Sequence, residues 1–403
     1  MSSRKKRIQK RNAELERVLK PLAHFKNSDP KGKKRGPVTA RAVRKHGDPR
    51  YADMLGEALS KQGKIDRATH GFHTYPAGMH PDCARIVIEA CPGAVHDPFC
   101  GGGTVLVESM LAGRQTSGSD LSPIALLVSA ARCSSPSMAT PMRSAARKIA
   151  AQAQLRIEVE VHETLVEWYE PHVAQELGRI RDEIPKYDEA VQPLLRALLS
   201  CIAVKCSYRK SDTSNKREVQ HRPVGTTATL FHKKAREFGR MLEKMPEATP
   251  KIYFGDACQA APPHPVDLIL TSPPYPGVYD YLPLQQLRYL WLDISDTKSK
   301  LEIGSRRNFR IKGRKDALKE WHLNTDRWIQ TQAQKLNPGG KMAIIVGDGL
   351  VGNKLVDALF PTVEAMKSAG MRIVARASAD RPDHARNAIR IEHLVLAEKE
   401  SAS

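Results

Sequence analysis

The sequence has no long apolar segment and no cysteine pair of the kind that binds a metal. No apolar run approaches the roughly 18 residues that suggest a membrane-spanning helix, and no signal-peptide pattern opens the chain. The seven cysteines include no Cys-x-x-Cys pair, which argues against a zinc cluster, and their odd number argues against a disulfide framework. We therefore expect a cytoplasmic protein without a membrane segment or a metal site.

Acidic residues are scarce relative to basic ones. The chain has 44 Asp and Glu against 64 Lys and Arg, a formal net charge of +20. The excess lies in three segments: residues 1–50 have 17 basic and 4 acidic residues, 205–240 have 10 and 3, and 304–316 have 6 and 1. Such clustering is typical of proteins that contact phosphates. Residues 1–50 are polar and interrupted by prolines, so we expect a basic, disordered tail, for which nucleic-acid contact and plain solvation both stay open.

A glycine-rich turn lies in the segment 94–104, which reads Ala-Val-His-Asp-Pro-Phe-Cys-Gly-Gly-Gly-Thr. The pattern predicts a short strand, the turn and then a helix. Glycines at such a turn let the backbone approach a nucleotide-like cofactor closely, and the helix N-terminus favours polar or anionic groups. A second predicted strand, 115–119, leads to Asp120, near the position about 20 residues beyond such a turn where a carboxylate accepts hydrogen bonds from ribose.

A second motif, Thr-Ser-Pro-Pro-Tyr at 271–275, directly follows an apolar strand pattern over 266–270. Two prolines neither continue a helix nor donate hydrogen bonds to a sheet, so the strand must end there. A hydroxyl, two carbonyls and an aromatic ring are thereby held at the carboxyl end of a strand, where ligands bind in open α/β sheets. Taken alone, the motif is also compatible with a proline turn or a polyproline ligand.

Together the two motifs resemble the S-adenosylmethionine-dependent amino-methyltransferases that act on DNA, the N4-cytosine and N6-adenine family. There, Asp-Pro-Phe-x-Gly-x-Gly-Thr is the cofactor-binding signature and Ser-Pro-Pro-Tyr the catalytic one. The resemblance covers residues 70–132 and 250–397, and it implies S-adenosyl-L-methionine as the cofactor and DNA as the partner. The cofactor-binding residues that it implies are Phe72, His73, Tyr75, Asp97, Phe99, Gly101, Gly103, Thr104, Asp120 and Asp256. The catalytic residues that it implies are Ser272, Pro273, Pro274 and Tyr275.

The chemistry expected at the second motif is amine methylation. An exocyclic amine is a poor nucleophile because its lone pair is delocalised into the base, and a stacked base must be flipped out to be reached. We expect the Ser272 hydroxyl and the Pro273 carbonyl to accept the amine hydrogens. Tyr275 is expected to stack on the flipped base, a contact worth about 1–3 kcal/mol.

The sequence favours cytosine as the base and leaves other acceptors open. In the family that the chain resembles, Ser at the first position of the tetrapeptide favours cytosine N4, whereas Asp or Asn is typical of N6-adenine enzymes. Cytosine C5 methylation needs a thiolate, normally from a Pro-Cys dipeptide, and no cysteine here follows a proline. Adenine N6, an RNA amine such as guanine N2, and a nucleic-acid binder without activity stay open, and so does a separately encoded restriction endonuclease as partner.

The alternation of strands and helices predicts an α/β fold. The resemblance implies a more specific fold, the Rossmann-like class I methyltransferase fold. This is a mostly parallel, doubly wound seven-stranded sheet with a helical insertion. The catalytic domain is expected over 51–134 and 250–403. Between Asp120 and Asp256 lie 135 residues, whereas one helix and one strand need only about 30–40.

Residues 135–249 are therefore expected to form a mainly helical insertion. By analogy with the variable segments of related methyltransferases, this insertion is a candidate target-recognition region, and a purely structural embellishment is the alternative. Guanidinium and ammonium groups bind phosphates and base edges. The residues expected to do so are Arg209, Lys210, Lys216, Arg217, Arg222, Arg306, Arg307 and Arg310.

Overall fold

The computed structural model describes residues 43–76, 78–212, 214–295, 302–351, 354–383 and 388–400. All of them belong to one compact unit, Arg41–Ser403. Residues 1–42, most of the predicted basic tail, lie outside the described residues, as does Ala77. None of the described helices is both long and apolar enough to cross a membrane.

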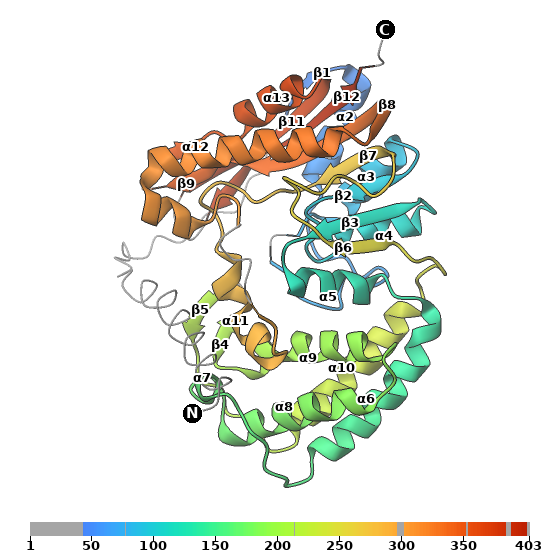
Figure 1. Cartoon of the computed structure of the whole chain (residues 1–403), viewed down its shortest axis with the longest axis vertical. Coiled ribbons are helices and arrows are strands. Elements are labelled where there is room, and N and C mark those ends of the chain that lie inside the picture. The colour runs from blue at the N-terminus through green and yellow to red at the C-terminus, as the bar shows by residue number, and fades with distance from the viewer. Residues whose placement is uncertain are drawn as a thin grey trace. The chain divides into compact units, whose positions relative to one another are not determined.

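An eight-stranded sheet forms the centre of the described residues (Figure 1), in the order β1-β11-β12-β8-β7-β2-β3-β6. The neighbours from β8 to β6 are parallel, and β12 runs antiparallel between β8 and β11. The strands are β1 Val43–Gly47, β2 Val95–Asp97, β3 Thr116–Asp120, β6 Lys251–Phe254, β7 Val266–Thr271, β8 Leu336–Gly347, β11 Met371–Asp383 and β12 Ala388–Lys399. This is the predicted Rossmann-like α/β fold, including the reversed strand near its end.

The predicted number of seven strands is wrong, because the sheet has an additional edge strand, β1. Its residues Val43–Gly47 pair antiparallel with Ala375–Ala379 of β11. The sequence Val-Arg-Lys-His-Gly has no apolar alternation, since only Val43 is partly covered and the other four residues are exposed. An edge strand of this kind is recognised by its backbone pairing and not by its side chains. The predicted tail therefore ends at least eight residues too late.

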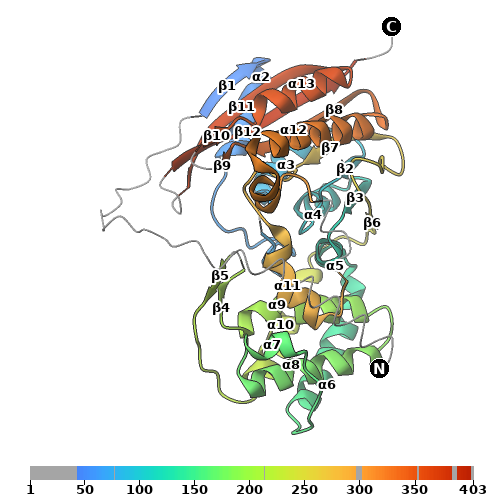
Figure 2. The same ribbon diagram turned by 60° about the vertical axis from the view of Figure 1, so that its left-hand side comes forward.

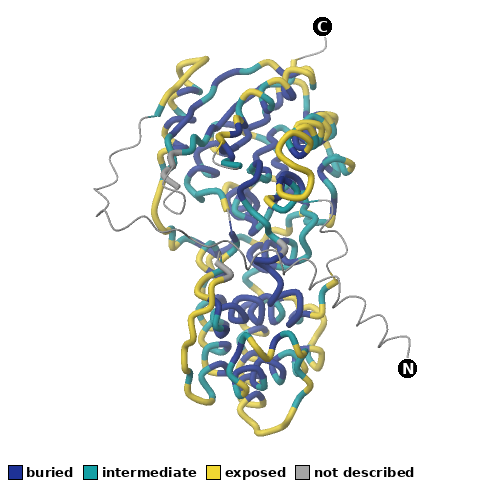
Figure 3. The backbone as a smooth tube through the Cα atoms, turned by 90° about the vertical axis from the view of Figure 1, so that its left-hand side faces the viewer, coloured by how far each residue is buried: buried dark blue, intermediate teal, exposed yellow. Residues whose placement is uncertain are grey.

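Helices cover both faces of the sheet, as a doubly wound fold requires (Figure 1), and the buried residues lie mostly inside, with the exposed ones along the outer helices and loops (Figure 3). Side chains alternate along β7: Leu268 and Leu270 pack with α2 (Pro49–Ser60) and α3 (Pro81–Ala90), whereas Ile269 packs with α12 (Arg306–Ala333). Helix α13 (Leu359–Ser368) joins α12 on that second face. Three further helices outside the insertion are α4 Thr104–Leu111, α5 Pro123–Arg132 and α11 Tyr281–Trp291.

The insertion is helical, as predicted, with a small hairpin at one end. Its helices are α6 Ala139–Ala153, α7 Glu163–Val166, α8 Pro171–Glu183, α9 Gln192–Cys206 and α10 Thr226–Leu242. The leucine-rich stripe of α9 is buried, as its apolar pattern predicts. The hairpin consists of β4 (Arg209–Ser211) and β5 (Ser214–Arg217). Outside the insertion, another hairpin, β9 (Gly349–Val351) and β10 (Lys354–Val356), precedes α13.

The packing of α2 leads to a stability prediction. Leu55 is fully buried between α2 and the sheet. Leu55→Ala should lower the free energy of unfolding by about 2–5 kcal/mol, since it removes buried methyl groups and leaves a cavity. Val166→Ala, at a residue 56% exposed, should change it by less than about 0.5 kcal/mol. Urea unfolding followed by circular dichroism measures both, and equal effects would contradict the packing of α2 against the core.

Candidate active site

The carboxyl ends of the parallel strands surround a cleft of about 430 Å³. Parallel strands end at the same edge of a sheet, so motifs far apart in the sequence meet there. The predicted residues that line the cleft are Tyr75, Asp97, Phe99, Gly101, Thr104, Asp120, Asp256, Ser272 and Pro274. The glycine-rich turn, the acidic residues after β3 and β6, and the Ser-Pro-Pro-Tyr turn are thus brought together.

A hydrogen bond joins the two motifs at the ends of the neighbouring strands β2 and β7. The Thr271 hydroxyl donates to Asp97 Oδ1 across 2.6 Å, and the backbone N–H of Phe99 donates to the same oxygen across 3.1 Å. Burial raises the pKa of Asp97 to about 7, and both hydrogen bonds oppose that rise. Since Ser272 follows Thr271 directly, this contact fixes the Ser-Pro-Pro-Tyr turn relative to the glycine-rich turn.

Asp120 connects the end of β3 to the glycine-rich turn. Its carboxylate accepts hydrogen bonds from the backbone N–H groups of Gly101 (2.9 Å) and Ser122 (2.8 Å). Burial raises the pKa of Asp120, and these two donors act in the opposite direction. A Cβ added at Gly102 would lie 2.9 Å from Tyr75 Cβ, so the turn has no room for a side chain where it passes Tyr75. The result is a bare backbone edge next to a carboxylate.

Three residues predicted to bind the cofactor do not line the cleft. The Phe72 ring stacks on Phe238 of α10 at 3.6 Å between centroids, and His73 Nε2 lies 3.0 Å from Ser200 Oγ of α9. Gly103 has φ 80° as the N-cap of α4, where a Cβ would lie 2.9 Å from Ser129 Cβ. Phe72 and His73 therefore attach this segment to the insertion, and Gly103 allows α4 and α5 to pack closely.

Arg132 is a central residue that the sequence analysis missed. It is 5% exposed and donates hydrogen bonds to three carbonyl oxygens, those of Gly102 (2.6 Å), His70 (3.0 Å) and His73 (2.6 Å). Burial lowers its pKa to about 10. Arg132 thus fastens the glycine-rich turn to the segment that carries Tyr75. In the sequence it is only a basic residue at the end of a helix, and no motif marks it.

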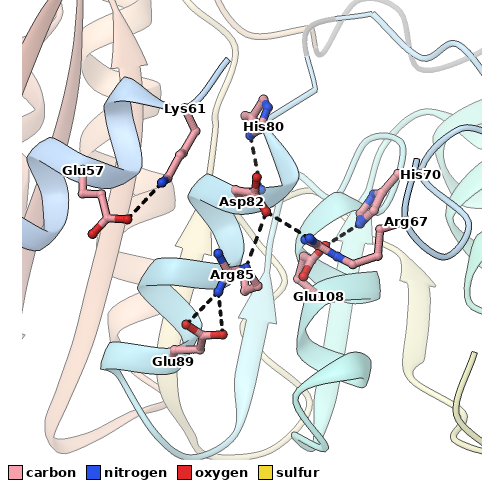
Figure 4. Close-up of polar contacts among 9 residues, drawn as sticks. All are labelled: Glu57, Lys61, Arg67, His70, His80, Asp82, Arg85, Glu89 and Glu108. Atoms are coloured by element: carbon pink, nitrogen blue, oxygen red, sulfur yellow. Dashed lines mark hydrogen bonds and ion pairs between the residues drawn. The ribbon is translucent and has the colours of Figure 1, made fainter. Parts of the chain in front are cut away.

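A buried ion-pair cluster supports the same segment from α3 and α4 (Figure 4). Glu108 Oε1 lies 2.6 Å from both Arg67 Nη2 and His70 Nε2, and Arg67 Nη1 donates to Asp82 across 3.0 Å. Glu108 is almost wholly buried on α4. Burial lowers the pKa of His70, while the neighbouring Glu108 raises it. Arg67 and Asp82 are partly exposed, whereas His70 and Glu108 are buried, and the shared contacts connect the loop before Tyr75 to α3 and α4.

The other end of the cleft is formed after β6. Asp256 lines the cleft, and its carboxylate accepts a hydrogen bond from the backbone N–H of Cys258 (2.9 Å), which shapes the loop. Phe254, 49% exposed, presents an aromatic surface to the cleft, and so do Tyr281 and Tyr289 of α11. None of these three aromatic residues belongs to a recognised motif. They reach the cleft because β6 ends there and because α11 follows the catalytic turn.

A second cavity, of about 350 Å³, borders the Ser-Pro-Pro-Tyr turn. Pro273 and Tyr275 line it, together with His80, Tyr279 and Glu392. The lining residues that it shares with the cleft are Gly78, Met79, Ser272 and Tyr281. Ser272 is thus the one residue of the Ser-Pro-Pro-Tyr turn that borders both spaces.

Tyr275 is held at its hydroxyl and at its ring. Its hydroxyl donates to Glu392 Oε1 across 3.1 Å and lies 3.4 Å from Ser272 Oγ. Burial and the adjacent carboxylate raise the pKa of Tyr275 well above its ordinary value. A Cβ added at Gly347 would lie 2.6 Å from Tyr275 Cε2, so the ring sits directly against the backbone of β8. The plane of the ring is therefore fixed.

The predicted basic residues fall into three groups. Arg209 is 6% exposed and donates to the carbonyls of Pro283 and Leu284, so the prediction that it contacts a phosphate is corrected: its guanidinium holds α11. Arg222 and Arg306 each use one guanidinium nitrogen within the fold: Arg222 donates to the carbonyl of Lys205, and Arg306 donates to that of Val278. The others keep exposed or partly exposed side chains: Lys210 pairs with Glu218, Arg217 lies over Trp168 and Tyr208, and Lys216, Arg307 and Arg310 complete the group.

Comparisons with known proteins give one partial sequence match. No family model matches the chain. A stretch of 70 residues is 37% identical to the type II methyltransferase M.MvaI of Kocuria varians, covering 16% of this chain and 15% of that protein. The matched region thus spans less than a sixth of that relative.

Solved structures similar to this chain are methyltransferases at low identity. TrmN from Thermus thermophilus is 13% identical with a TM-score of 0.30, covering 79% of this chain and 48% of that one. The rRNA methyltransferase AviRa of Streptomyces viridochromogenes is 11% identical with a TM-score of 0.28, covering 81% and 88%. The glycopeptide N-methyltransferase MtfA, complexed with S-adenosyl-L-methionine, is 9% identical with a TM-score of 0.30, covering 88% and 100%. Scores this low do not define a function.

The raised pKa of Asp97 leads to a pH-dependent prediction. A carboxyl with a pKa of about 7 in the folded state and 3.8 as its ordinary value holds its proton longer in the folded protein. Its contribution to stability is therefore complete below about pH 4 and is lost as the pH rises to about 7. Asp97→Asn does not titrate, so urea unfolding from pH 5 to 8 should show the variant gaining on the wild type. A constant difference would contradict the raised pKa.

Proposed function

We propose that this chain is an S-adenosylmethionine-dependent methyltransferase that modifies the exocyclic amine of a flipped base in DNA, with cytosine N4 as the favoured acceptor. The observation that carries the proposal is the position of Ser272 between the two cavities. A transfer reaction needs a donor and an acceptor on opposite sides of the groups that align them. The cleft suits the donor, and the second cavity suits the acceptor base.

The donor set of the cleft fits S-adenosylmethionine. The glycine-rich turn leaves backbone edge free for close approach, and Asp120 offers a carboxylate for the ribose hydroxyls. Phe254 and Asp256, at the other end, suit the adenine ring and its amino group. The carboxyl groups of Asp97, Asp120, Asp256 and Glu302 line this space, which suits a cofactor with a positive sulfonium and a positive ammonium group. When bound, this cofactor supplies an electrophilic methyl group, whose bonding pair stays on sulfur as the amine lone pair forms the N–CH₃ bond.

The residues of the chain contribute alignment and polarisation. The Ser272 oxygen and the Pro273 carbonyl are suited to accept the two amine hydrogens, which draws the nitrogen lone pair out of conjugation. A neutral serine is too weak a base to remove a proton from the amine beforehand, so the proton leaves once the methylated amine has become acidic. The fixed ring of Tyr275 offers a flat surface in the acceptor cavity on which a base can stack.

Charge and sequence support nucleic acid as the acceptor. Lys210, Lys216 and Arg217 form a basic hairpin on the insertion, and Arg307 and Arg310 lie at the start of α12, next to the segment that follows the catalytic turn. The partial match to a type II methyltransferase supports DNA over RNA. Ser272 at the first position of the tetrapeptide supports cytosine N4 over adenine N6, by the family resemblance. On this proposal, the insertion reads the target sequence.

The proposal is tested by transfer of a tritiated methyl group from S-adenosylmethionine to duplex DNA or to total RNA, with mass spectrometry of the digested nucleosides. We expect N4-methylcytosine in DNA. N6-methyladenine would move the assignment to the other amine, and transfer to RNA alone would contradict DNA as the substrate. No transfer to either acceptor would contradict the activity itself.

Tyr275→Ala separates the two cavities in function. The variant should bind S-adenosylmethionine with the affinity of the wild type, since the ring lines only the acceptor cavity. Turnover should fall by at least about 10- to 100-fold, the kinetic equivalent of a base–aromatic stack. Isothermal titration calorimetry gives the first quantity and the methyl-transfer assay the second. Wild-type turnover would remove Tyr275 from the site.

A further inference from the structure

A chain of hydrogen bonds connects the catalytic turn to the last strand of the sheet. Ser272 Oγ donates to the Tyr275 hydroxyl across 3.4 Å, and the Tyr275 hydroxyl donates to Glu392 Oε1 across 3.1 Å. The other carboxylate oxygen of Glu392 accepts from the guanidinium of Arg381, whose Nε lies 2.5 Å away. The chain therefore begins at an ion pair and ends at the serine hydroxyl.

The ion pair is set into the wall of the acceptor cavity. The side chains of Glu392 and Arg381 are 20% and 24% exposed, and both line that cavity with Tyr275. Arg381 Nη2 also donates to the carbonyl of Leu59, at the end of α2, across 3.2 Å. The guanidinium is thus held from two sides, and it occupies the carboxylate oxygen of Glu392 that does not face Tyr275. An ionised carboxylate only accepts hydrogen bonds.

The register of the sheet brings Glu392 to Tyr275. Glu392 on β12 is paired with Gly347 on β8. The Tyr275 ring lies against the backbone of Gly347, where no side chain intervenes. The phenol oxygen consequently reaches the carboxylate of the neighbouring strand. The sequence carries no sign of this contact, because Glu392 stands in a strand whose pattern indicates only alternation.

We propose that Glu392 is a positioning residue for methyl transfer, which acts through Tyr275 to set the direction of the Ser272 hydroxyl. This inference rests on the proposed function. Because Glu392 accepts the phenol proton, the phenol oxygen is left to accept the Ser272 proton. The lone pairs of Ser272 then remain available for an amine hydrogen of the base. Without the carboxylate, the phenol can donate to Ser272 instead, and the serine proton competes with the amine for the same space.

The hydrogen-bond chain is testable without any substrate. Protein labelled with 3-fluorotyrosine gives a ¹⁹F resonance for Tyr275, assigned by its loss in Tyr275→Phe. Glu392→Ala should move this resonance. The matched control is Glu398→Ala, because Glu398 on the same strand pairs with Arg372 and Lys341 at the far end of the sheet. A Tyr275 resonance that is the same in Glu392→Ala and in the wild type would overturn the proposal.

Kinetic measurements test whether the hydrogen-bond chain from Ser272 to Glu392 contributes to methyl transfer. On the nucleic acid that the wild type methylates, Glu392→Ala and Tyr275→Phe should each lower kcat by about 100-fold, the cost of a misaligned reacting group. The KM for S-adenosylmethionine should not change, and Glu398→Ala should behave as the wild type. Because both residues act in one chain, the double variant should be no slower than the slower single variant. Reductions that multiply to about 10,000-fold would overturn the proposal.

An isosteric variant separates positioning from a merely structural role. The Glu392→Gln amide oxygen still accepts from Tyr275, so this variant should recover at least tenfold of the kcat lost in Glu392→Ala, with a melting temperature near that of the wild type. It also serves as the test protein if Glu392→Ala does not fold. Full wild-type kcat in Glu392→Ala would refute the inference while the proposed function stands. Absence of transfer by the wild type would refute both, and the two results are therefore distinct.

Discussion

The hydrogen bond between Thr271 and Asp97 is the contact on which the arrangement of the site depends. It joins residues 174 positions apart in the sequence, at the ends of two adjacent parallel strands. Strand pairing sets the spacing of β2 and β7 but does not by itself fix the turns that follow them. The shared carboxylate oxygen ties both turns at their first residues. Because Asp97 is buried, no water replaces this bond, and the distance between the cofactor turn and Ser272 is set within a narrow range.

The insertion and the site share one helix, α11, and this limits how independently they can move. Arg209 and Arg196 donate to carbonyls at the two ends of α11, and Arg288 of α11 is wholly buried between Ser200 and Asp212 of the insertion. Figure 2 shows α11 beside α9, and the same helix presents Tyr281 and Tyr289 to the cleft. If the insertion binds nucleic acid, as proposed above, a displacement of the insertion would also move α11, and with it Tyr281, which lines both cavities.

Sequence reasoning reached those parts of the structure that local patterns encode. Apolar alternation, the glycine-rich turn and the paired prolines each specify backbone geometry within a few residues, so the fold class and the residues around Ser272 and Asp97 could be predicted. Contacts that depend on the register between distant strands could not. Glu392 meets Tyr275 only because β12 pairs with β8, and Arg132 meets three carbonyls only because α5 packs under the loop. The strand β1 was missed for the same reason, since its backbone pairing is unrelated to its polar side chains.

Buried arginines show a further limit of reading charge from the sequence. Arg132, Arg209 and Arg288 count toward the net charge, yet their guanidinium groups are buried and bind inside the fold: Arg132 and Arg209 donate to carbonyls, and Arg288 donates to a carbonyl and pairs with Asp212. A planar group with five donors can serve several loop carbonyls at once, which a lysine cannot. Within the basic segment 205–240, Arg209 therefore stabilises the packing of α11 and adds nothing to an exposed basic surface.

The close contact between Gly347 and the Tyr275 ring limits which substitutions the second cavity tolerates. The Tyr275 ring fills the space beside Gly347, and a side chain at position 347 would collide with that ring. Neither can be exchanged alone without a collision or a void. Met79, His80 and Tyr279 also line this cavity but lie outside the strands of the sheet. On the function proposed above, a change of acceptor base is therefore expected at these three residues before Tyr275 and Gly347.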